Sequence, residues 1–214
     1  MRKNPMKNHQ QHYLAYIKQF AEKNKCPVWL SGSFLHGCAT AFSDIDISVF
    51  CNAKKLNELI YGYGKPVYIS YTQKPLGILI VIYEDGVAVD LEIIAKTDVT
   101  GDKYFHTNAL AQNKYSRNEE LYKAFYLRDD AFYHAARLFH RSLIKFLSGK
   151  QETGISIAGE AAAFLHDNRP INKANYKNRI TALLNTFHTL HPLPWEYLAV
   201  LYELIELLNE KSVP

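Results

Sequence analysis

The chain has 214 residues, of which 48% are hydrophobic and 21% charged, and its formal net charge is +4. This composition is typical of a globular protein with one large core or two modest ones, and no apolar run approaches the roughly 18 residues that cross a bilayer. The charge suits an anionic ligand such as a nucleotide, but a dedicated nucleic-acid binder has a far denser basic surface. We therefore expect no membrane partner, and nucleic acid stays open as a partner without being favoured.

The N-terminal sequence and the cysteine pattern indicate in which cellular compartment the protein works. The first nine residues are basic and no apolar segment follows them, so we predict no secretion signal and expect a cytoplasmic protein. The three cysteines, Cys26, Cys38 and Cys51, contain no CxxC pair, and their odd number does not favour a disulfide framework. We interpret them as small buried thiols in preference to a zinc half-site. The sequence leaves a homodimer open.

Helices and strands are predicted to alternate in the first half of the chain. Apolar residues at intervals of three and four predict a helix over residues 13–21, and a shorter helix is predicted over 54–61. Asp85-Gly86 between two apolar runs predicts a hairpin that joins 78–83 to 87–94, because both residues tolerate the positive φ of a tight turn. Strands are also predicted at 28–30, 44–50 and 67–71, with a short helix after Gly32-Ser33. Together they predict a small mixed sheet with helices on one face.

The second half is predicted to be helical. The segment between Lys96 and Asn118 is rich in Gly, Asp, Asn, Thr and Lys, which indicates a domain boundary. Gly149 is expected to end one of the helices that follow. We therefore predict an α+β protein, with a sheet domain at residues 1–112 and an all-α helical bundle at 113–214. The expected helices of the second half cover 119–127, 130–147, 156–166, 173–190 and 195–208.

Three aspartates occur in the predicted strands of the first half. Side chains alternate along a strand, so Asp44 and Asp46 are expected to project from the same side. Asp90 lies in the middle of an otherwise apolar segment. Neighbouring carboxylates repel, and buried acids without partners are too costly to keep, so the three predict a divalent metal. Ligands that are all oxygen favour Mg²⁺ or Mn²⁺.

The turn Gly32-Ser33 follows a predicted strand and precedes a short predicted helix. A helix start offers unpaired backbone N–H groups and the positive end of the helix dipole, which together suit a phosphate. Gly32 lets the backbone approach a ligand closely, and Ser33 can donate both its hydroxyl and its N–H. A phosphate site beside a metal pair indicates a protein that handles nucleotides.

This arrangement resembles the nucleotidyltransferase superfamily that includes DNA polymerase β. The resemblance rests on Gly32-Ser33, an interval of ten residues, Asp44-Ile45-Asp46 and then Asp90 between two apolar residues. It is closest to the minimal nucleotidyltransferases and to the aminoglycoside and lincosamide nucleotidyltransferases, and Ser43-Asp44-Ile45-Asp46-Ile47 is similar to streptomycin/spectinomycin adenylyltransferases. The resemblance covers roughly residues 25 to 96, less than half of the chain. It is specific for the superfamily and weak for the substrate.

The resemblance implies a metal-dependent nucleotidyltransferase. Such an enzyme moves a nucleoside monophosphate, with AMP from ATP as the expected case, to a hydroxyl of a small, antibiotic-like acceptor and releases pyrophosphate. Asp44 and Asp46 would hold two Mg²⁺ or Mn²⁺ ions, and Asp90 would complete the inner one. Gly32 and Ser33 would bind the β and γ phosphates. Antibiotic resistance is one physiological role that such an acceptor would imply, and the sequence leaves the role open.

The general base is open at this point. Asp90 can ligate a metal, accept the proton of the attacking hydroxyl, or do both. Glu92 shares a strand face with Asp90, although an ion pair or a solvated acid is the simpler interpretation. Some of the antibiotic nucleotidyltransferases that this chain resembles use a glutamate of the helical domain as the general base. Glu160 lies among small apolar residues in the predicted helical half and is the candidate for that role. The acids that compete with it are Glu119, Glu120, Asp129 and Asp130.

Two further alternatives concern the helical half and the class of protein. His134, Arg137, Arg141 and Lys145 recur at helical spacing and form a basic stripe, which is either a solvated face or a clamp for an anionic substrate. Three classes of protein are open. The first is an enzyme that modifies a small acceptor, and the second is a regulatory or antitoxin-type nucleotidyltransferase that modifies a protein or tRNA. The third is a nucleotide-binding module without catalytic activity. The intact Asp44, Asp46 and Asp90 disfavour this third class.

Overall fold

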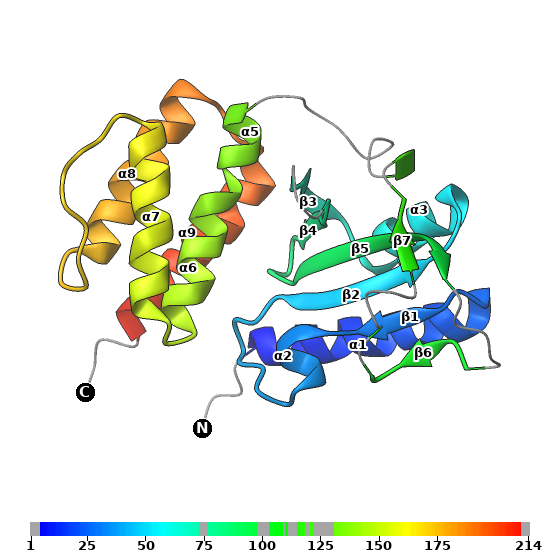
Figure 1. Cartoon of the computed structure of the whole chain (residues 1–214). Coiled ribbons are helices and arrows are strands. Elements are labelled where there is room, and N and C mark those ends of the chain that lie inside the picture. Colours follow the sequence, from blue (N-terminus) through cyan, green and yellow to red (C-terminus); the bar gives the residue numbers. More distant parts are fainter. Residues whose placement is uncertain are drawn as a thin grey trace. The chain divides into compact units, whose positions relative to one another are not determined.

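The structure is a computed structural model that describes residues 5–72, 77–97, 103–108, 110, 115–118, 120–121 and 131–210. Its contacts divide the chain into two compact units, Met1–Leu127 and Arg128–Pro214 (Figure 1). The first unit contains a mixed sheet with helices and the second is helical, so the protein is α+β as predicted. The domain boundary predicted after residue 112 falls inside the first of these units.

The first unit begins with a long helix and then alternates strands with short helices. The prediction for the first helix covered only residues 13–21, whereas α1 begins at Pro5, a residue suited to the first position of a helix. The elements of the unit are α1 (Pro5–Asn24), β1 (Val28–Leu30), α2 (Gly32–Leu35), β2 (Ile45–Phe50), α3 (Ala53–Tyr63), β3 (Pro66–Tyr71), β4 (Leu79–Tyr83), β5 (Ala88–Thr97), β6 (Phe105–His106) and β7 (Tyr115–Arg117).

The sheet has the strand order β3-β4-β5-β2-β1-β6, and β7 pairs with β5. β2 runs parallel to β5 and antiparallel to β1, so the sheet is mixed. The predicted hairpin is confirmed: β4 and β5 pair antiparallel, and Gly86 adopts a φ of 81° in the turn between them. The end of β1 and the beginnings of β2 and β5 consequently lie at the same end of the sheet.

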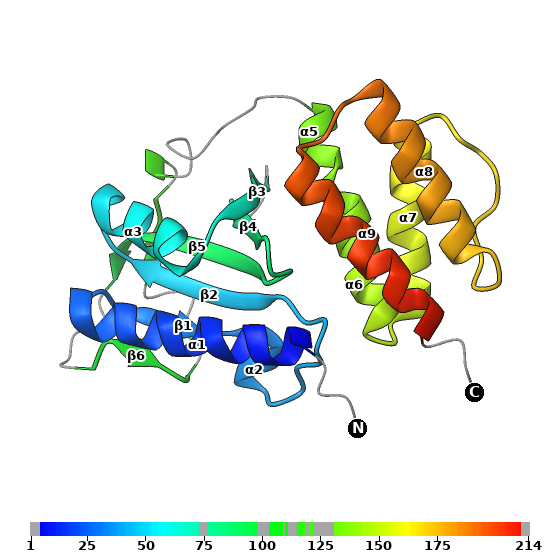
Figure 2. The ribbon, with the colours of Figure 1, turned by 180° about the vertical axis from the view of Figure 1, so that it is seen from behind.

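Both α1 and α3 pack against one face of the sheet (Figure 2). Every second residue of the two central strands joins this core: Ile45, Ile47 and Val49 from β2, and Val89, Leu91 and Ile93 from β5. Because side chains alternate along a strand, the intervening residues of β2 and β5 belong to the other face. That face carries the polar residues of the two strands.

The segment between Lys96 and Asn118, where the sequence indicates a domain boundary and predicts no strand, contains strands in its described part. β5 continues to Thr97, β6 pairs parallel with β1, and β7 pairs antiparallel with β5. Strands of two or three residues have too few positions to display an alternating pattern, and their order comes from pairing with a neighbour.

The second unit consists of helices that agree broadly with the prediction. The predicted helix over 130–147 is interrupted at Ala136, and Gly149 follows α6 with a φ of 92°, as expected of a helix stop. The helix predicted over 119–127 lies almost entirely outside the described residues. The elements are α5 (Ala131–Ala135), α6 (Arg137–Leu147), α7 (Gln151–Phe164), α8 (Tyr176–Leu190) and α9 (Trp195–Glu210).

A close approach of α6 and α7 holds the second unit together. Ser142 on α6 is fully buried, and its hydroxyl donates to the carbonyl oxygen of Gly154 on α7 at 2.7 Å. A Cβ atom at Gly154 would lie 2.9 Å from the backbone nitrogen of Phe146 and 2.9 Å from the carbonyl oxygen of Ser142. Only glycine therefore fits at this crossing without moving the helices apart.

Replacing two glycines of α7 tests this packing. We expect Gly154→Ala to lower the free energy of unfolding by about 1–3 kcal/mol, because an added methyl group overpacks a backbone contact. Gly159→Ala is the matched control, since nothing lies within 4 Å of its added Cβ. It should be neutral or stabilise by up to about 1 kcal/mol through helix propensity. Urea unfolding measures both, and equal effects of the two substitutions would contradict the close crossing.

Within the described part of the chain, no helix is both long enough and apolar enough to span a membrane.

Candidate functional site

Asp46 and Asp90 are direct neighbours in the sheet. In the parallel pairing of β2 with β5, Asp46 is the register partner of Asp90. The residues on either side of each aspartate in its strand point into the core beneath α1 and α3. Because side chains alternate along a strand, both aspartates belong to the opposite face of the sheet. Both side chains are half-buried. The sheet thus sets two carboxylates side by side, as an electrostatically unfavourable pair that a cation would stabilise.

Gly32 lies against the carboxylate of Asp46. Its φ is 60°, a conformation that residues with a side chain adopt at a cost. A Cβ atom at Gly32 would overlap Asp46 Oδ2 and would lie 2.6 Å from Asp46 Cγ. The turn is tied to β2 by a backbone hydrogen bond in which the N–H of Ser31 donates to the carbonyl oxygen of Asp46 at 2.9 Å. The Gly32-Ser33 turn and the aspartates, predicted from separate parts of the sequence, therefore meet.

The hydroxyl of Ser33 is a buried polar group whose hydrogen bonding is not satisfied within the described structure. Leaving a buried hydroxyl unsatisfied costs about 1–3 kcal/mol, so the site is suited to a ligand that accepts from it. A phosphate oxygen is such an acceptor. The helix dipole contributes little, because α2 has only four residues.

Asp44 lies just before β2, at the end of the loop that follows α2. Thr40 and Ser43 stabilise this loop: the N–H of Thr40 donates to Ser43 Oγ at 2.9 Å. Gln10 of α1 is buried and donates from Nε2 to the carbonyl oxygen of Ser43 at 2.6 Å. Buried Phe42 anchors the same loop in the core. No motif in the sequence identified these supporting residues, because their roles depend on contacts between segments that are distant along the chain.

The structure does not gather the three aspartates into one metal-holding group. Among the described residues, no three His, Cys, Asp or Glu side chains are arranged so that they could hold a metal ion. Asp46 and Asp90 are paired in register, whereas Asp44 lies outside the strand ladder. Their oxygens can converge only if a cation offsets their mutual repulsion. The donor set itself, carboxylate oxygens alone, is the set that Mg²⁺ and Mn²⁺ prefer.

Glu92 lies one step further along the same face, and it is engaged in the sheet. Ser48 is its register partner and donates from Oγ to Glu92 Oε2 at 2.8 Å. On the other side of Ser48, Trp29 stacks on His106 with ring centroids 4.9 Å apart. Burial, reinforced by Lys103, lowers the pKa of His106.

Glu160 and the residues of the predicted basic stripe belong to the second unit. Glu160 is exposed on α7. Arg137, Arg141 and Lys145 follow one another on α6, whereas His134 lies on the separate helix α5, so the break at Ala136 divides the predicted basic stripe. Of the acids that compete with Glu160, Glu120 is exposed, and Glu119, Asp129 and Asp130 lie outside the described residues.

Comparison with known proteins adds no family assignment. No family model matches the chain, and no curated protein matches it.

Proposed function

We propose that the chain is a metal-dependent nucleotidyltransferase that moves a nucleoside monophosphate from a nucleoside triphosphate, with ATP as the expected donor, to a hydroxyl of a small acceptor. One observation carries the proposal. Gly32 lies against the carboxylate of Asp46, and Asp46 lies beside Asp90 in the sheet. A turn suited to a phosphate and two carboxylates suited to a divalent cation thus share one end of the sheet. The resemblance of the Gly-Ser and Asp-x-Asp motifs to nucleotidyltransferases supports the same conclusion.

The residues present fit a divalent cation. Asp46 and Asp90 supply adjacent carboxylates, and Asp44 would complete the set once their repulsion is offset. Bound Mg²⁺ or Mn²⁺ would neutralise the charge of the triphosphate and polarise its α-phosphate. Two ions are the expected number, as in the superfamily that the motifs resemble.

The protein's own groups would orient the reaction. The unsatisfied hydroxyl of Ser33 would donate to a phosphate oxygen and hold the leaving pyrophosphate. Asp90 would accept the proton of the attacking hydroxyl, because its carboxylate lies beside Asp46 in the sheet, at the end that also contains the Gly32-Ser33 turn. Proximity and alignment of the two reactants would supply much of the rate enhancement.

A label-transfer experiment tests the proposal. The protein is incubated with Mg²⁺ and ATP labelled at the α or the γ phosphate, in the presence of an aminoglycoside, a lincosamide, tRNA or lysate protein. We expect the α label to reach a small acceptor and the γ label to leave as pyrophosphate. Transfer of the γ label would indicate a phosphotransferase and contradict the proposal. Transfer of the α label to tRNA or protein would favour the regulatory alternative.

Ser33→Ala tests the phosphate contact. We expect the affinity for a non-hydrolysable ATP analogue with Mg²⁺ to fall by about fivefold to a hundredfold, because a hydrogen bond to a charged group contributes about 1–3 kcal/mol. Ser116→Ala, at an exposed serine of the same unit, should leave the affinity unchanged. Calorimetric titration measures both. Equal affinity in the wild type and Ser33→Ala would move the phosphate site elsewhere.

A further inference from the structure

Two of the three cysteines are opposite each other at the end of the sheet that is remote from Gly32. The antiparallel pairing of β1 with β2 sets Val28 against Val49, and a hydrogen bond from the N–H of Phe50 to the carbonyl oxygen of Pro27 extends the ladder by one pair. One further step in the same register sets Cys26 against Cys51.

The hydrogen-bonding pattern also defines the type of this pair. Ladder hydrogen bonds join Phe50 to Pro27 and Ser31 to Asp46, so these two pairs occupy hydrogen-bonded positions. The two types of position alternate along an antiparallel ladder, so the next pair beyond Pro27 and Phe50 is of the other type. Cys26 and Cys51 therefore occupy a non-hydrogen-bonded position, where Cα atoms approach to about 4.5 Å. A disulfide spans Cα separations of about 4.4–6.8 Å, so the backbone needs little movement to accommodate one.

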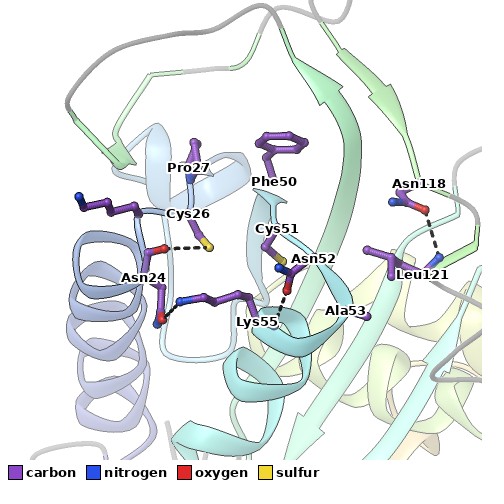
Figure 3. A pocket seen from close by; sticks show the side chains of 11 residues that line it. Asn24, Cys26, Pro27, Phe50, Cys51, Asn52, Ala53, Lys55, Asn118 and Leu121 are labelled. Atoms are coloured by element: carbon purple, nitrogen blue, oxygen red, sulfur yellow. Dashed lines mark hydrogen bonds between the residues drawn. The ribbon is translucent and has the colours of Figure 1, made fainter.

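Both thiols also line one pocket. Its volume is about 760 Å³, and its wall includes Cys26, Cys51 and Lys55. Figure 3 shows the two cysteine side chains on this wall, with Lys55 reaching across below them to donate to Asn24. Cys26 is buried, whereas Cys51 is more accessible and Cys38 is exposed away from the pair. Burial raises the pKa of the Cys51 thiol to about 12, and the neighbouring Cys26 contributes to the rise.

We propose that Cys26 and Cys51 are a redox pair that forms an intramolecular disulfide between the beginning of β1 and the end of β2. This inference is independent of the proposed nucleotidyltransferase function. With hydrogen peroxide as the oxidant, the sulfur of Cys51 attacks one peroxide oxygen and the O–O bond breaks. The departing hydroxide takes up the thiol proton and leaves as water, so that Cys51 becomes a sulfenic acid. The sulfur of Cys26 then attacks the resulting sulfenic acid, forming the S–S bond and releasing a second water. Two thiols are oxidised and one peroxide is reduced.

The linkage would join two helix–strand junctions. Cys26 lies two residues after the end of α1, and Cys51 immediately precedes the N-cap of α3. The two helices that cover the core face of the sheet would thus be tied at one end, and the pocket would narrow. Since a protonated thiol is a poor nucleophile, we expect oxidation to be slow at neutral pH.

The test uses the full chain carrying Cys38→Ser, which removes the exposed thiol and leaves the pair. The folded protein is treated with hydrogen peroxide, and the thiols that remain are alkylated after unfolding. We expect the reduced protein to take up two alkyl groups and the oxidised protein none, with a mass lower by two hydrogen atoms and a peptide in which Cys26 is joined to Cys51. A reductant should restore both thiols.

Two control proteins complete the test. Cys26→Ser and Cys51→Ser, each combined with Cys38→Ser, should give no intramolecular linkage. The proposal is overturned if the folded Cys38→Ser protein yields sulfinic acids without a linkage. It is equally overturned if the linkage forms only after the protein has been unfolded in urea.

Discussion

Gly32→Ala is expected to reduce nucleotide transfer by at least about 100-fold, as much as the loss of a group that stabilises the transition state electrostatically. The added methyl group would overlap the carboxylate of Asp46 and would force it out of the row that it shares with Asp90. Alanine is also strained at a φ of 60°. Transfer rates and analogue binding measured on the same preparation would separate loss of chemistry from loss of affinity.

Gly37→Ala is the matched control for this substitution. Gly37 has a φ of 67°, so alanine there carries the same backbone strain, but nothing lies within 4 Å of its added Cβ. We expect both variants to lose about 1 kcal/mol of stability through strain, and only Gly32→Ala to lose activity. If the two variants lost activity equally, the loss would come from strain in the loop backbone. That result would contradict a role for the contact between Gly32 and Asp46.

Asp46→Asn and Asp90→Asn should separate stability from function. Each substitution removes a negative charge from the row, so like-charge repulsion between the two strands falls. We therefore expect an unfolding temperature in EDTA equal to or higher than that of the wild type, together with a loss of transfer of at least about 100-fold. Mg²⁺ should raise the unfolding temperature of the wild type and not that of either variant.

Glu84→Gln is a suitable control for the charge change, because Glu84 is an exposed acid of the same unit. It should alter neither activity nor the response to Mg²⁺. Retention of more than about a tenth of the wild-type activity in Asp46→Asn would count against the proposed site.

The sequence predicted the parts of the first unit that depend on local pattern. Apolar runs predicted the central strands at 44–50 and 87–94, and Asp85-Gly86 predicted the hairpin between β4 and β5. Both signals arise within a few residues, since strand faces alternate with a period of two and tight turns need residues that tolerate positive φ.

Long-range relations were harder to predict. The motif spacing suggested that Gly32 serves a ligand, whereas the structure gives it a neighbour within the protein, the carboxylate of Asp46. The edge strands β6 and β7 have no signature of their own because they are ordered by pairing. Similarly, the opposition of Cys26 and Cys51 follows from strand register, which the cysteine spacing does not reveal.

The most direct test of the proposed site is paramagnetic broadening by Mn²⁺ in the presence of a non-hydrolysable ATP analogue. Amide resonances near a bound Mn²⁺ ion disappear from the NMR spectrum, so the measurement locates the ion without any knowledge of the acceptor. We expect the signals of Gly32, Ser33, Asp46 and Asp90 to disappear first, while those of Cys51 and Lys55, at the opposite end of the sheet, persist. Persistence of the Asp46 and Asp90 signals, with broadening elsewhere, would contradict the proposed site.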